Sequence, residues 1–98
     1  MRAKLLFRQK YIYNDGAIVQ IKAWSVPMSA RTPEGFKYSL VYIDRLGNRL
    51  LGYDNAEGKG HHRHEGKEET AVIFKSIEKL AEKFLKEVDA IRGHRYEN

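Results

Sequence analysis

The sequence predicts an α+β fold, a four-stranded antiparallel meander sheet followed by one C-terminal amphipathic helix packed on one face of the sheet. Three observations predict it. Stretches rich in Val, Ile, Leu and Tyr alternate with short turn segments, and the hydrophobic period then changes from two to about 3.6 residues in the last third of the chain. The length of 98 residues is that of one domain, so we expect residues 1–98 to form a single unit.

The first two strands are expected at about residues 4–13 and 17–26. The Asn-Asp-Gly sequence at 14–16 between them readily takes the positive φ that tight hairpins need, which predicts antiparallel pairing. Pro27 ends the second strand because proline has no N–H to donate to a ladder. A longer loop follows, over residues 28–35.

A third strand is expected at about residues 36–44 and a fourth at about 49–54, joined by a turn containing Gly47. The next segment, residues 55–66, contains glycines and three of the four histidines, and we predict that it is a loop. This segment is called the His loop below.

The helix is expected over about residues 70–92. Glu68 and Glu69 suit the positive end of its dipole, Thr70 could cap it, and Gly93 could end it. Apolar residues recur there at helical spacing, at Ile73, Phe74, Ile77, Leu80, Ala81, Phe84, Leu85, Val88 and Ile91.

Both faces of the predicted sheet carry apolar side chains. In the third strand, Tyr38, Leu40 and Tyr42 alternate with Val41 and Ile43. One helix covers one face, so we expect a protein partner on the other, aromatic face, and a homodimer is one such arrangement. Stacked bases or a half-exposed sheet would also satisfy the pattern.

Composition limits the class of protein. Without cysteine the chain has no disulfide or thiolate chemistry. No apolar run approaches the roughly 20 residues needed to span a bilayer, and no signal-peptide core is present. We therefore expect a cytoplasmic protein with no membrane association.

The net charge of +5 is concentrated in the predicted sheet. Residues 1–64 carry 11 basic and five acidic side chains, whereas residues 65–92 carry six basic and seven acidic ones. Such a distribution favours an anionic partner such as RNA or DNA, although ordinary solvated charge would give the same count.

The His loop is the candidate chemical site. Histidine titrates near neutral pH and is the commonest metal ligand. Two histidines can act as the base and the acid that RNA cleavage by an internal 2′-hydroxyl requires, and a carboxylate can orient one of them. His62 and His64 are the first catalytic candidates, followed by His61 and Asp54.

Neighbouring residues supply the groups that would bind a phosphate. Lys59 or Arg63 could provide positive charge, Gly58 and Gly60 would let backbone N–H groups approach closely, and Asn55 adds an amide. Asp54 and Asn55 could equally shape the turn that ends the fourth strand.

The same histidines could instead bind a divalent metal such as Zn, Ni or Mn, together with Asp54 or Glu65. In an extended segment His62 and His64 would face one side and His61 the other, which argues against all three ligating one ion. A polar loop that only makes hydrogen bonds is the third interpretation.

The chain also resembles the TumE-like toxin family of bacterial and archaeal toxin–antitoxin systems. The resemblance extends from Asp15-Gly16 through residues 38–42 to the helix, and its most specific part is residues 53–56 with Gly58 and the His-Arg-His sequence at 62–64. It implies a small cytosolic growth inhibitor, encoded beside a helix-turn-helix antitoxin that neutralises it, with RNA as target.

Residues and resemblance together predict a toxin-like protein that cleaves RNA with its His/Asp loop. The alternative is a non-enzymatic protein-binding module in which the His loop is structural or binds metal.

Overall fold

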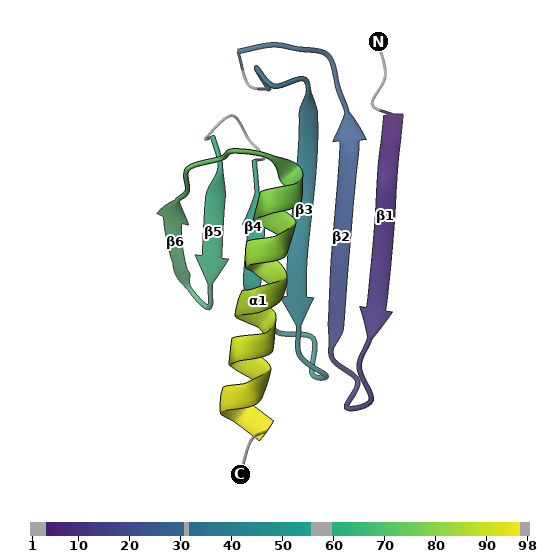
Figure 1. Cartoon of the computed structure of the whole chain (residues 1–98), viewed down its shortest axis with the longest axis vertical. Coiled ribbons are helices and arrows are strands. Elements are labelled where there is room, and N and C mark those ends of the chain that lie inside the picture. Colours follow the sequence, from purple (N-terminus) through teal and green to yellow (C-terminus); the bar gives the residue numbers. More distant parts are fainter. Residues whose placement is uncertain (1–3, 31, 56–59, 97–98) are drawn as a thin grey trace.

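The computed structural model describes residues 4–30, 32–55 and 60–96. These residues form a six-stranded antiparallel sheet of order β1-β2-β3-β4-β5-β6, followed by one helix (Figure 1). The elements are β1 (Lys4–Ile12), β2 (Ile18–Ser25), β3 (Phe36–Ile43), β4 (Arg49–Asp54), β5 (His62–Glu65), β6 (Glu68–Ala71) and α1 (Ile77–Tyr96).

The α+β class, the antiparallel meander and the C-terminal helix are confirmed, but the prediction of four strands is wrong. The His loop, predicted over residues 55–66, contains β5, and β6 occupies the first residues of the predicted helix. The two short strands turn at Gly66, whose φ of 59° is a conformation that glycine adopts without strain. Their charged sequences have no apolar face by which a strand could be predicted.

The helix begins at Ile77 and not near residue 70. Ser76 caps it, because the backbone N–H of Lys79 donates to the Ser76 hydroxyl at 3.1 Å. Ile73 matches the helical spacing, but it lies before the helix and is 88% exposed. It therefore does not pack in the core.

The core lies between α1 and one face of the sheet, chiefly over β3 and β4 (Figure 1). Phe84 of α1 meets the Tyr53 ring edge-on, with centroids 6.2 Å apart. The buried hydrophobic residues of this core are Ala17, Val19, Ile21, Ala23, Tyr38, Leu40, Tyr42, Leu51, Tyr53, Leu80, Phe84 and Val88.

The tyrosine-rich face is therefore the one that the helix covers. Tyr38, Tyr42 and Tyr53 are all buried in the core on this side of the sheet, and hence cannot form a contact surface for a second copy. Trp24 lies on the opposite face, because it pairs with Lys37 while the neighbouring Ala23 pairs with Tyr38. The sheet surface that points away from α1 is called the open face below.

The far end of α1 is fixed to the sheet by Arg92. Its guanidinium lies 3.7 Å from the centre of the Tyr13 ring and donates to the Tyr42 hydroxyl at 3.0 Å, while Asp15 lies 3.3 Å from its Nη2.

Among the described residues, no helix has the length and apolar composition required to cross a membrane.

Candidate functional site

Two of the predicted catalytic histidines lie side by side on the open face. In the pairing of β4 with β5, His62 is opposite Asp54 and His64 is opposite Gly52. The two imidazole centroids are 6.5 Å apart. The predicted alternation of the histidines is confirmed, because β5 is an extended strand and its first and third residues, His62 and His64, share one face.

Each of these imidazoles contacts a carboxylate. His64 Nε2 lies 3.1 Å from Asp54 Oδ2, and His62 Nδ1 lies 3.1 Å from Glu69 Oε2. Both histidine side chains are largely shielded, at 17% and 15% exposure, whereas Asp54 is 26% and Glu69 is 41% exposed. A carboxylate that faces a ring nitrogen fixes the orientation of the imidazole.

Glu69 is the partner that sequence reasoning missed. It belongs to β6, where it pairs with His64 and reaches diagonally to His62. The sequence assigns it to the start of the helix, and only recognition of a short hairpin about Gly66 would have placed it beside the histidines.

His61 does not join this pair. Its Nδ1 lies 2.8 Å from the Tyr38 hydroxyl, its Nε2 lies 2.8 Å from Glu34 Oε2, and its ring stacks on Phe74 with centroids 4.4 Å apart. The hydrogen bond from His61 lowers the pKa of Glu34, and burial raises the pKa of Tyr38. These contacts tie the β2–β3 loop to the chain on both sides of the β5–β6 hairpin.

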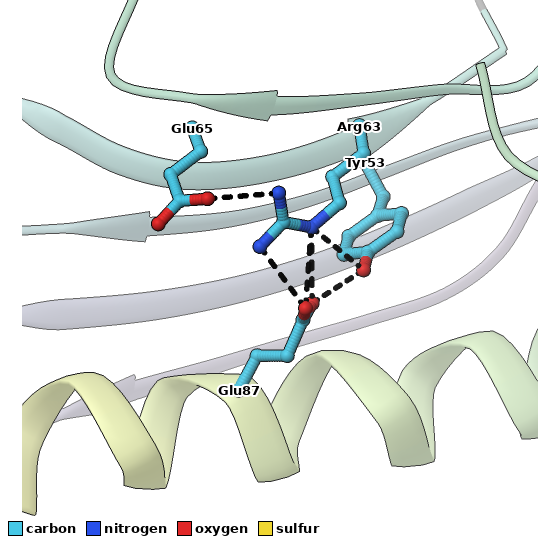
Figure 2. A network of polar contacts seen from close by, with 4 residues as sticks. All are labelled: Tyr53, Arg63, Glu65 and Glu87. Atoms are coloured by element: carbon cyan, nitrogen blue, oxygen red, sulfur yellow. Dashed lines mark hydrogen bonds and ion pairs between the residues drawn. The ribbon is translucent and has the colours of Figure 1, made fainter. Parts of the chain in front are cut away.

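Arg63 also points away from the histidine pair, toward α1 (Figure 2). Its Nη2 lies 3.0 Å from Glu87 Oε2, its Nη1 donates to Glu65 at 2.9 Å, and its Nε donates to the Tyr53 hydroxyl at 3.2 Å. The Tyr53 hydroxyl in turn donates to Glu87. Burial alone would lower the pKa of Arg63, but the hydrogen bonds to Glu87 and Glu65 raise it overall, so Arg63 is a permanent cation.

The other predicted substrate-binding residues are dispersed. Asn55 is buried, accepting from the Tyr38 N–H at 3.0 Å and donating to the Phe36 carbonyl at 3.0 Å, so its amide continues β3 pairing beyond the end of β4. Gly60 is exposed, with a φ of 81°. Gly58 and Lys59 lie outside the described residues.

Arg49 lies next to the site, where the sequence did not place it. A Cβ built on Gly52 would meet the Arg49 side chain at 3.2 Å, and so the bare glycine leaves room for that side chain beside His64. Of the two cations predicted from the sequence, Lys59 lies outside the described residues and Arg63 faces α1, whereas Arg49 of β4 lies on the open face.

The open face continues as a basic surface toward β1. Cross-strand pairing aligns Arg8, Lys22, Ser39, Asp54 and His62 in one row. A second row aligns Lys10, Gln20, Val41, Gly52 and His64. Both rows begin with a base at the β1 edge and end with a histidine on β5.

Metal ligation was the other interpretation of the histidines. Within residues 4–30, 32–55 and 60–96, no three His, Asp or Glu side chains converge as a metal-binding group. The two imidazoles instead form separate pairs with Asp54 and Glu69.

Comparison with protein families identifies the family of this chain. A family model described as toxin TumE matches residues 2–92, which is nearly the whole chain. The comparisons found no match among curated proteins and none among solved structures. Toxins of toxin–antitoxin systems have an antitoxin as their partner, and the family therefore implies one for this chain. The chain belongs to the TumE toxin family and is the toxin component of a toxin–antitoxin system.

Proposed function

We propose that this toxin acts in the cytoplasm by cleaving RNA on the open face of its sheet, with His62 and His64 as the acid and base. The observation that supports the proposal is the pair of neighbouring imidazoles, each against its own carboxylate, with centroids 6.5 Å apart. Internal attack of a 2′-hydroxyl on its phosphate needs one group that accepts a proton and one that donates a proton to the leaving oxygen.

The carboxylates leave one nitrogen of each ring for proton transfer. His64 would act through Nδ1, because its Nε2 faces Asp54. His62 would act through Nε2, because its Nδ1 faces Glu69. One of the two would serve as the base and the other as the acid.

The positive charge that the phosphate requires comes from the open face. Arg49 lies over Gly52 beside His64 and would stabilise the charge that develops on the phosphoryl oxygens. Lys22 and Arg8 extend the charge toward β1. Three strand spacings separate Lys22 from His62, about 15 Å, so both could contact one strand of RNA. Trp24, on the same face, offers a ring for a base to stack on.

The test is incubation of purified protein with mixed RNA, using His62→Ala, His64→Ala and Asp54→Asn. We expect each histidine variant to lower the cleavage rate by about 100-fold or more, which is the usual contribution of a general acid or base. Asp54→Asn should lower the rate less, because the imidazole itself remains. Equal cleavage by wild type and both histidine variants, or cleavage by none of the proteins, would remove the catalytic proposal.

Two matched controls separate chemistry from folding and from charge. His61→Gln removes the imidazole that precedes β5 and contacts Tyr38, and it should leave the rate per folded molecule near wild type. Lys22→Glu should weaken RNA binding more than Lys79→Glu, an identical change on an exposed position of α1. Parallel reactions with EDTA test the metal interpretation, since full inhibition that Mn or Zn reverses would replace the metal-free mechanism.

The antitoxin itself is proposed to be of the helix-turn-helix type, as the resemblance implies. Purification of the complex and binding to the operator DNA of its own gene test this assignment. An antitoxin that binds no DNA would contradict it.

A further inference from the structure

Strand β1 is an exposed edge of the sheet. It is nine residues long, every one of them exposed, and it lies at the opposite edge from β6 (Figure 1). Its side chains include several large exposed apolar ones, at Leu5, Leu6, Phe7, Tyr11 and Ile12. An edge of this length and composition readily pairs with another strand, and soluble proteins usually protect it.

A groove runs beside this edge on the face that carries α1. The helix packs on β3 and β4 and leaves a space of about 440 Å³ over β1 and β2. Val19 and Ile21 form the floor of the groove, and Tyr11 and Leu85, at 61% and 41% exposure, stand on its two sides. The groove is thus mostly apolar and lies next to β1, the edge strand.

We propose that the antitoxin inserts an extended, acidic segment along β1 as a seventh strand, with alternate apolar side chains in this groove. Charge complementarity identifies the partner, because β1 carries Lys4, Arg8 and Lys10 and no acidic residue. A second copy fits poorly, since two paired β1 strands would bring three bases from each copy close together with no acidic side chain on either strand to compensate their charge. Strand addition combines main-chain hydrogen bonds with pockets for alternate side chains.

This placement would also explain neutralisation. Arg8 and Lys10 begin the two basic rows of the open face, so acidic side chains on an added strand would compete with RNA phosphates there. The inference rests on membership of the toxin family and not on RNA cleavage. Its binding test therefore stands even if the protein cleaves no RNA.

The experiment uses the full chain and its cognate antitoxin, co-expressed and purified as a complex. Hydrogen exchange is compared between the free chain and the complex. We expect strong protection of backbone amides in β1 and little change in β6, the other edge strand of the described sheet. Protection confined to β6 or to the open face of β5 would overturn the proposal.

Substitutions give an independent measurement. Tyr11→Asp and Leu85→Asp place a charge in the groove at exposed positions, and we expect each to weaken antitoxin binding by about 30-fold or more, the effect typical of an interface hot spot. Leu46→Asp is the matched control, since Leu46 is 76% exposed and lies in the β3–β4 turn. Equal affinity of all three variants refutes the docking surface. A free chain that is dimeric, and that Tyr11→Asp converts to a monomer, would assign the edge to a second copy instead.

Discussion

The contact between Arg63 and Glu87 should couple the β5–β6 hairpin to α1, and a double-mutant cycle measures that coupling. The perturbations are Arg63→Ala, Glu87→Ala and the double variant. In the structure, Nη2 and Nε of Arg63 lie 3.0 Å and 3.2 Å from Glu87 Oε2, so two N–H groups of the guanidinium converge on one carboxylate oxygen, and Nε also lies 3.4 Å from Oε1 (Figure 2). The Tyr53 hydroxyl donates to the same carboxylate.

The magnitude follows from burial. The Arg63 and Glu87 side chains are 21% and 26% exposed. An exposed ion pair contributes about 0–1 kcal/mol to stability, and breaking a fully buried one costs about 3–5 kcal/mol. This pair lies between these limits, so we expect a coupling energy of about 2 kcal/mol. If Glu87→Ala loses this coupling energy and little else, a urea m-value of about 1–2 kcal/mol per molar for a domain of this size predicts a midpoint lower by about 1–2 M.

The assay is urea unfolding followed by far-UV circular dichroism for the wild type and the three variants. Glu82→Ala is the matched control, because Glu82 is an exposed acid on the same helix and should change stability by less than about 0.5 kcal/mol. A coupling energy below about 0.5 kcal/mol would show that the network behaves as a surface ion pair, and the proposed link between hairpin and helix would be wrong.

Two further predictions concern buried polar groups. Burial first and the bond to Glu87 second raise the pKa of Tyr53 from 10.0 to about 12, so its contribution to stability is complete below pH 10 and is lost as the pH rises through about 12. Alkaline unfolding should therefore be shallower in Tyr53→Phe, and an unchanged pH profile would contradict this. Asn55→Ala should cost about 2–3 kcal/mol in chemical unfolding, because it removes the partners of two β3 backbone groups, whereas a neutral result would refute the structural role of Asn55.

The first four strands could be predicted from sequence because their signals are local. The Asn-Asp-Gly turn and Pro27 limit β2, and the alternation of apolar residues identifies the face that α1 covers. β5 and β6 gave no such signal, since each has four residues and neither contains a buried side chain. Their stability comes from pairing with β4 and from polar contacts, which no window of apolar periodicity detects.

The candidate site was predictable in part for the same reason. Alternate residues of any extended segment share a face, and the predicted proximity of His62 and His64 is confirmed. The positions of Glu69 and Arg49 depend on strand register. The orientation of Arg63 depends on its contact with Glu87 of α1, which lies 24 residues later in the sequence. Arg63, which lies between the two histidines in the sequence, therefore faces away from them, and Arg49 is the cation on their face of the sheet.

The alternation along β5 also explains how one short strand can serve stability and chemistry together. Arg63 faces α1 and is held by Glu87, while His62 and His64 face outward with no buried apolar side chain of β5 to anchor them. The position of the two imidazoles therefore depends on the polar network on the opposite side of the strand. A substitution that breaks the Arg63–Glu87 contact should loosen the hairpin and displace both histidines, even though neither residue touches the open face. Stability and toxicity should consequently fall together in Arg63 variants, whereas His62→Ala and His64→Ala should separate the two.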